Sequence, residues 1–225
     1  MDSKHGLPVA ENRLPRNFTP TAPNPVWTSD MTYLWTNEGW LYLVIVLDLF
    51  NREVVGWSLK PRLTAEIVTD ALTMAWFRKH LAPVLLHHSD RGRQYASQAF
   101  QDKLKAFGMT CSMSRKENSW DNAPTESGFK RFKNEREHGV RDETQAYIKA
   151  TAFEYIEVCY NRKPLHSTLG YKSPMEFLNA WNQQQQTKLG ASNPSPLGRR
   201  KTEGTSPRQW DSCDCPADRA TAPLS

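Results

Sequence analysis

Hydrophobic residues in the first part of the chain fall into three short runs separated by turn residues. The runs span residues 26–34, 40–48 and 54–59, and the middle one is apolar almost throughout. Such a run is typical of a strand that is buried on both faces. The segments between the runs contain Asn37-Glu38-Gly39 and Asn51-Arg52, which are typical of turns. The pattern therefore predicts three strands joined as an antiparallel meander.

Beyond residue 60 the apolar residues recur at intervals of three and four, which is the period of a helix. Helices are predicted over residues 64–80 and 97–107, with Thr64 and Ser97 as N-caps. Short apolar segments at 84–88 and 109–113 follow these helices and predict a fourth and a fifth strand. This order predicts an α/β fold with a mixed five-stranded sheet and helices on both faces, which is the ribonuclease H-like layout.

Three more helices are predicted in the second half of the chain. The first begins near Asp121, because Asp121 or Asn122 is a suitable N-cap and Pro124 suits a first helical turn. The second spans residues 144–161, and the third is short, from Ser173 to about Trp181. The expected organisation is an extended proline-rich arm over residues 1–25, a core over 26–181 and a disordered tail over 182–225.

Composition narrows the class of protein only moderately. A chain of 225 residues with 38% hydrophobic residues is long enough for one domain with a substantial core. The net charge of +5 is mild, so the placement of charge is more informative than its sum. No apolar run approaches the length of a membrane span and the N-terminus is unlike a signal peptide, so we expect a cytoplasmic protein with no membrane segment.

Three acidic residues lie where the predicted topology brings chain segments together. Asp30 lies within the first strand, Asp90 lies just past the fourth, and Glu126 lies in the first turn of the later helix. The first and fourth strands are expected to be neighbours, and the helix is expected to cross that edge of the sheet. Carboxylates that converge repel one another unless cations neutralise them, and oxygen ligands suit Mg²⁺ or Mn²⁺. The predicted site therefore holds divalent metal, with two ions expected.

Other interpretations of these residues remain open at this stage. Asp90 is also compatible with a simple turn, and the helix after Asp121 with an amphipathic surface helix carrying a Glu126–Lys130 pair. Asp48 ends an apolar strand and is interpreted as a turn residue or as a support for the site. His87 and His88 are interpreted as structural or substrate-facing, because no second cluster with metal-ligand spacing accompanies them.

At these residues the sequence resembles the catalytic subunits of bacterial insertion-sequence transposases, whose core is similar to that of retroviral integrases and carries three acidic residues. Thirty-five residues, 91 to 125, separate Asp90 from Glu126, which is the spacing that this family shows. The matching motifs are Trp27-Thr28-Ser29-Asp30-Met31-Thr32-Tyr33, His88-Ser89-Asp90-Arg91-Gly92 with Gln94-Tyr95, Ser112-Met113-Ser114-Arg115-Lys116, Trp120-Asp121-Asn122-Ala123 with Glu126, and His166-Ser167-Thr168-Leu169-Gly170-Tyr171 with Ser173-Pro174.

The resemblance implies a metal-dependent enzyme that cleaves DNA phosphodiesters at element ends and joins them to target DNA. Asp30, Asp90 and Glu126 would hold the metal ions. Lys130 and Lys133 would contact the DNA backbone, and further DNA contacts are expected from Arg91, Arg115 and Lys116. The resemblance also implies a homo-oligomer assembled on DNA, located with the bacterial nucleoid. We expect the helix-turn-helix region to come from a partner or from a fusion with an upstream frame.

The sequence departs from the family pattern at four positions, which are Arg93, Glu117, Gly128 and Pro164. Gly128 would lie inside the helix that carries Glu126, where glycine costs about 1 kcal/mol relative to alanine. Two alternatives are therefore kept. The first is another enzyme on the same fold, a ribonuclease H-like nuclease or a resolvase, and the second is an inactive DNA-binding fragment of a decayed transposase.

Overall fold

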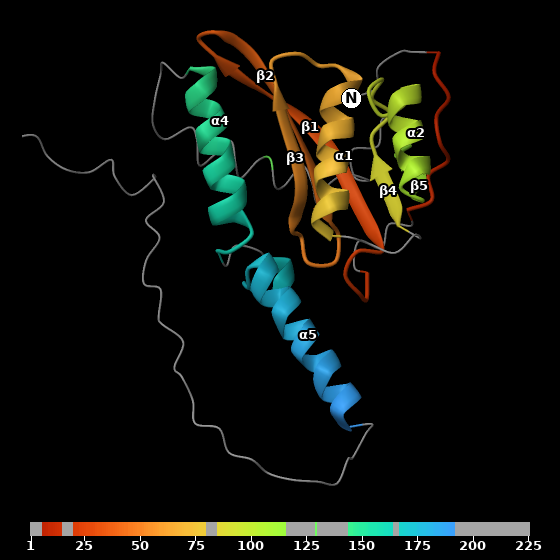
Figure 1. The fold of residues 1–225 in the computed structure, drawn as a ribbon, viewed down its shortest axis with the longest axis vertical. Coiled ribbons are helices and arrows are strands. Elements are labelled where there is room, and N and C mark those ends of the chain that lie inside the picture. The colour runs from red at the N-terminus through yellow and green to blue at the C-terminus, as the bar shows by residue number, and fades with distance from the viewer. Residues whose placement is uncertain are drawn as a thin grey trace, which may run out of the picture.

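The computed structural model describes residues 6–14, 20–79, 85–115, 129, 144–163 and 167–191. Within this part of the chain, five strands form one sheet in the order β3-β2-β1-β4-β5 (Figure 1). The strands are β1 (Val26–Thr36), β2 (Gly39–Asp48), β3 (Val54–Lys60), β4 (Leu86–Ser89) and β5 (Thr110–Met113).

Strand pairing follows the order that the sequence predicts. β1 pairs antiparallel with β2, and β2 pairs antiparallel with β3. β4 pairs parallel with β1 from Val26↔Leu86 to Ser29↔Ser89, and β5 pairs parallel with β4. The predicted mixed sheet is therefore confirmed, and so is the expectation that the first and fourth strands are neighbours.

Four α-helices accompany the sheet in the described part of the chain. Ser97 caps α2, as predicted, and its Oγ accepts a hydrogen bond from the backbone N–H of Phe100. Thr144 caps α4 in the same way, and α4 continues as a π-helical segment over Glu154–Tyr160. The helices are α1 (Ala65–Lys79), α2 (Gln98–Ala106), α4 (Gln145–Phe153) and α5 (Pro174–Ala191).

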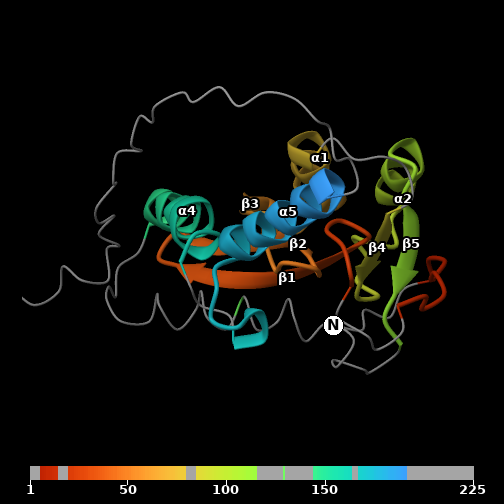
Figure 2. The same cartoon turned by 90° about the horizontal axis from the view of Figure 1, so that it is seen from below.

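The sheet separates two hydrophobic cores. α1 and α2 lie next to each other on one face, where they pack on Trp27 and Val46 (Figure 2). α4 and the π-helical segment cover the other face, where Leu34 and Ile45 belong to the second core. Figure 1 shows β3 between α4 and α1. Because the side chains of a strand alternate between faces, each β1 residue can be assigned to one core or the other.

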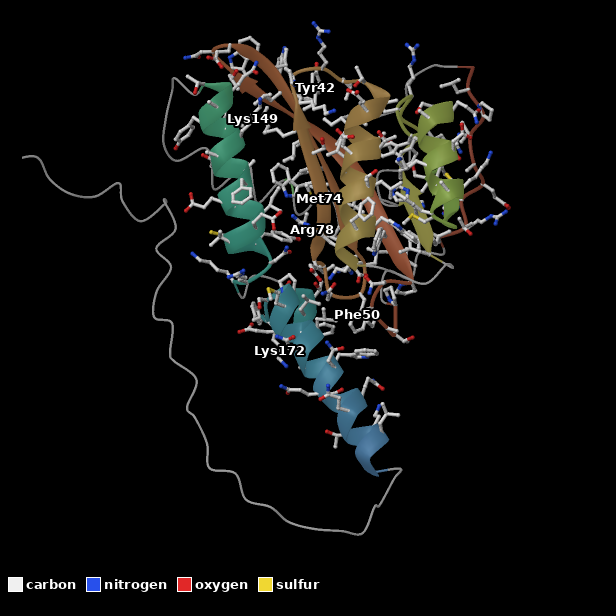
Figure 3. All side chains as sticks on the ribbon, viewed as in Figure 1. Tyr42, Phe50, Met74, Arg78, Lys149 and Lys172 are labelled. Atoms are coloured by element: carbon white, nitrogen blue, oxygen red, sulfur yellow. The ribbon has the colours of Figure 1, made fainter. Side chains whose placement is uncertain are left out.

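The last helix corrects one sequence prediction. The sequence pattern predicts a helix that ends near Trp181 and a disordered tail that begins at residue 182. In the structure, α5 continues to Ala191. Its start is fixed by a capping box, in which Ser173 and Glu176 exchange side-chain-to-backbone hydrogen bonds of 2.8 and 3.2 Å. Phe177 and Trp181 pack on Phe50, which Figure 3 shows beside the start of the helix. A helix begun in this way continues through the following glutamines because glutamine is a good helix former.

The proline-rich arm packs on the sheet. The described parts of the arm, residues 6–14 and 20–25, contain neither helix nor strand. β1 begins directly after them. The backbone N–H of Arg13 donates to the Oγ of Ser112 on β5 at 2.9 Å, and Leu14 is buried. The arm therefore lies along the outer strand β5.

In the described residues, no helix is both long and apolar enough to cross a membrane.

Candidate active site

Asp30 and Asp90 occupy matching positions on neighbouring strands. Ser29 and Ser89 form the last pair of the parallel β1–β4 ladder, and the two aspartates are the residues that follow them. Neighbouring strands lie about 4.8 Å apart, and residues in register on parallel strands share a face. The two carboxylates therefore project from the same region of the sheet, between the interior strands β1 and β4, and on the same face.

The backbone around Asp90 is fixed by short hydrogen bonds. The N–H of Gly92 donates to Asp90 Oδ1 at 2.8 Å, and the carboxylate is largely buried. A Cβ at residue 92 would lie 2.8 Å from the same oxygen, so a larger residue here would displace the Asp90 carboxylate. The Nε of Arg91 donates to the carbonyl of Ser114 at 2.8 Å, which ties the loop after β4 to the end of β5.

Asp30 lies on the sheet face that carries the second core. Its Oδ1 accepts from the backbone N–H of Met31 at 2.8 Å, and its cross-strand partner on β2 is Ile45. Ile45 and Phe129 line the same small apolar cavity between the sheet and the π-helical segment. Phe129 is helical and buried, and it is the described residue nearest in sequence to Glu126.

A buried tyrosine lies behind the two aspartates. The hydroxyl of Tyr95 lies 3.1 Å from the Oγ of Ser29, which directly precedes Asp30. Burial raises the pKa of Tyr95 well above its ordinary value, and the negative charges of Asp90 and Asp30 raise it further. The phenol therefore stays neutral and keeps its proton beside the carboxylates.

The two histidines of β4 point to opposite faces of the sheet. His87 is fully buried among Tyr95 and Phe100, with ring centroids 6.4 and 5.3 Å away. Burial lowers the pKa of His87 to about 3, with a smaller contribution from neighbouring His88. The Nδ1 of His88 lies 2.9 Å from the Oγ of Ser112. These contacts support the structural interpretation of both residues.

Asp48 lies beside the N-terminal end of β1, level with Trp27, whereas Asp30 lies in the middle of that strand. Its carboxylate accepts from the backbone N–H groups of Phe50 and Asn24 at 3.0 and 2.9 Å, as a turn residue does. Burial raises the pKa of Asp48 to about 6. Asp48 pairs with Trp27, three residues before Asp30, which places it about 10 Å away along the strand. It is therefore a turn residue, one of the two roles that the sequence suggested.

The described residues include only some of the predicted site. Asp30 and Asp90 are brought together, Arg91 binds the Ser114 carbonyl, and Arg115 is exposed just past β5. Glu126, Lys116, Lys130 and Lys133 lie outside the described residues. Among the residues that are described, no group of three or more potential metal ligands occurs. The sequence alone indicates no role for Tyr95 or Ser29, because a hydrogen bond between residues 66 positions apart leaves no local signal in the sequence.

Comparisons with known proteins identify the family of the chain. The integrase core domain family matches the chain over residues 20–119 and again over residues 126–181. The transposase InsF for insertion sequence IS3A of Escherichia coli (strain K12) is 46% identical over 175 residues, which cover 78% of this chain and 61% of that protein. The transposase for insertion sequence element IS904 of Lactococcus lactis subsp. lactis (strain IL1403) is 44% identical over 166 residues, which cover 74% of this chain and 66% of that protein. The chain thus spans less than two thirds of the length of these relatives.

Solved structures show the same fold at much lower sequence identity. The HTLV-2 integrase catalytic core domain in complex with magnesium, in its dimeric form, aligns with a TM-score of 0.52 and 18% identity over 70% of this chain and 98% of that chain. A chain of the simian T-cell lymphotropic virus intasome in complex with PP2A regulatory subunit B56 gamma gives a TM-score of 0.55 and 17% identity, covering 92% of this chain and 66% of that one. At these identities the likeness concerns the fold, which is ribonuclease H-like.

Proposed function

Because the chain belongs to the integrase core domain family of insertion-sequence transposases, we propose that it is the catalytic core of a transposase. In this role it cleaves DNA phosphodiesters at the ends of a mobile element and joins the freed ends to target DNA. The observation that supports the proposal is the register of β1 and β4, whose last pair, Ser29↔Ser89, directly precedes Asp30 and Asp90.

Glu126 is proposed as the third carboxylate. Support comes from Phe129, which lies three residues later in the sequence and is helical. Phe129 lines a cavity with Ile45, and Ile45 pairs directly with Asp30. Cross-strand partners have their Cβ atoms about 5 Å apart, and residues three apart on a helix share a face. Phe129 thus supports a position for Glu126 on the face that carries Asp30.

Carboxylate oxygens from Asp30, Asp90 and Glu126 form a donor set that fits Mg²⁺ or Mn²⁺, since both prefer hard oxygen ligands. The solved HTLV-2 integrase core was determined in complex with magnesium, which agrees with this choice. Two such ions, when bound, supply Lewis-acid chemistry that activates the attacking oxygen and stabilises the leaving one. The role of the protein is to hold the carboxylates in register and the DNA in line. No side chain of this chain is needed as a covalent nucleophile.

DNA contacts are proposed for basic residues around the two aspartates. Arg115 is exposed at the end of β5, and Arg91 is partly buried in the loop after Asp90. Lys116, Lys130 and Lys133 complete the proposed set from the sequence pattern. Contacts of this kind bind the phosphate backbone and carry little sequence information. A homo-oligomer on DNA, and a helix-turn-helix module from a partner or a fused frame, are proposed to supply end recognition, with the protein acting at the bacterial nucleoid.

Cleavage and strand transfer on a labelled duplex that carries an element end test this proposal. With Mg²⁺ or Mn²⁺ the wild-type chain is expected to nick the end and join it to a target duplex, whereas Asp90→Asn should do neither. Asp48→Asn is the matched control, because it makes the same change at a turn carboxylate about 10 Å from Asp30 along the strand and should retain both reactions.

Three outcomes of this experiment contradict the proposal. Nicking without strand transfer, or cleavage of the RNA strand of a hybrid, would indicate a nuclease on the same fold. DNA binding with no metal-dependent nicking would indicate an inactive fragment. Equal loss of activity in Asp48→Asn and Asp90→Asn would show that the site has been placed wrongly.

A further inference from the structure

Tyr95 is held rigidly in the loop that follows Asp90. Its side chain is fully buried, and its ring packs edge-to-face on Phe100 at 5.4 Å. Its backbone N–H donates to the carbonyl of Gly92 at 3.0 Å, and its own carbonyl accepts from the Nε2 of Gln101 at 2.8 Å. The position of the phenol is therefore determined by both the loop and α2.

The hydroxyl of Tyr95 connects this loop to β1. The Oγ of Ser29 donates to the carbonyl of Ile45 at 3.1 Å, so its only proton is already used. Tyr95 must therefore donate to Ser29 across their 3.1 Å separation. The resulting chain of hydrogen bonds runs from the Asp90 loop through Ser29 to Ile45, which is the cross-strand partner of Asp30.

Strand pairing alone does not hold the two aspartates together. The β1–β4 ladder ends at Ser29↔Ser89 in the described residues, one position before both carboxylates. The Tyr95–Ser29 hydrogen bond is thus a side-chain link between the two aspartate-bearing segments at the end of that ladder. Both aspartates lie close enough to the phenol for their charges to act on it.

We infer that Tyr95 is a positioning residue whose hydroxyl, bonded to Ser29, fixes the spacing of Asp30 and Asp90 for divalent metal binding. The inference rests on the proposed function, because the spacing matters only if the two carboxylates share metal. Tyr95 has no contact with solvent, so it acts through the segments that carry the aspartates and not on DNA directly.

The test uses Tyr95→Phe, Ser29→Ala and the double variant, with Tyr42→Phe as the control. Tyr95→Phe removes only the hydroxyl and preserves the ring that packs on Phe100. Tyr42→Phe makes the same change on β2, where the ring is partly buried against the same core. The first readout is Mn²⁺ binding to the protein without DNA, measured from the free Mn²⁺ electron paramagnetic resonance signal. The second is the Mg²⁺ concentration that gives half-maximal nicking.

Losing one hydrogen bond worth about 1 kcal/mol predicts Mn²⁺ binding about fivefold weaker in Tyr95→Phe. The Mg²⁺ concentration for half-maximal nicking should rise by a similar factor, while Tyr42→Phe should match the wild type. Because the two residues act as one link, the double variant should be no weaker than the weaker single variant. A purely structural role would lower the melting temperature without changing metal affinity in the folded protein.

Wild-type metal affinity in a folded Tyr95→Phe protein, or additive losses in the double variant, would overturn the inference and leave the proposed function standing. If Tyr95→Phe does not fold, Ser29→Ala decides the question by the same two readouts. A folded wild-type protein that neither binds Mn²⁺ nor nicks DNA would instead overturn the proposed function, and the inference with it.

Discussion

At the scale of single residues, the buried histidine of β4 gives a stability effect with a definite pH dependence. The folded protein keeps His87 neutral because burial lowers its pKa to about 3 from 6.5. The unfolded chain binds a proton below pH 6.5, so the contribution of His87 to stability is complete above that pH and is lost as pH falls toward 3. Asp48 acts in the opposite direction, since a pKa raised from 3.8 to about 6 makes the folded state bind a proton in that window.

Replacing His87 with leucine should remove the pH dependence that His87 adds to the free energy of unfolding. Each pH unit below the unfolded-state pKa of His87 lowers the wild-type free energy of unfolding by about 1.4 kcal/mol. Between pH 7.5 and pH 4.5, the free energy of unfolding of His87→Leu should therefore rise by about 2–3 kcal/mol relative to that of the wild type. Urea unfolding of both proteins at several pH values measures the difference, and the Asp48 contribution cancels because both proteins carry it. A difference in stability that stays constant with pH would show that the pKa of His87 is the same in the folded and unfolded states.

At the scale of elements, the close contact between β3 and α1 depends on Gly56. A Cβ at this position would lie 2.7 Å from the backbone nitrogen of Ala75 and 2.8 Å from its Cβ, both on α1. Gly56→Ala should therefore push α1 away from the sheet and cost about 1–3 kcal/mol, as overpacking does. Gly6→Ala is the control, because residue 6 is exposed and a Cβ there meets nothing within 4 Å, and it should change stability by less than about 0.5 kcal/mol. Equal unfolding free energies for Gly56→Ala and the wild type would contradict this packing.

Elements with local signals could be predicted from the sequence, and long-range links could not. Apolar runs and the Ser97 cap indicate strands and a helix start because the causes lie within a few residues. The topology then places Asp30 beside Asp90 without further information. The packing of α5 on the core depends on Phe50, which lies far from Phe177 in sequence, and the Tyr95–Ser29 bond joins residues 66 positions apart. Such pairs are specified only by the folded arrangement.

At the scale of the whole molecule, the fold is a sheet between two cores, and the proposed metal centre lies where β4 ends beside the middle of β1. The arm crosses the outer strand β5 near Ser112, and Ser112 contacts His88, two residues before Asp90. The Asp48 turn and the attachment of α5 through Phe50 lie near the N-terminal end of β1. The proposed catalytic carboxylate Asp30 and the anchoring of the C-terminal helix are thus assigned to different parts of β1, about three residues apart.

A change of ligand chemistry at the aspartates tests the central claim most directly. A cysteine thiolate is a soft ligand that Mg²⁺ binds poorly and that Mn²⁺ tolerates better. Asp30→Cys and Asp90→Cys should therefore lose DNA nicking with Mg²⁺ and regain part of it with Mn²⁺, whereas Asp90→Ala should be inactive with both metals. Folded cysteine variants that nick DNA as well as the wild type with Mg²⁺, or that are equally inactive with both metals, would contradict the assignment of Asp30 and Asp90 as metal ligands.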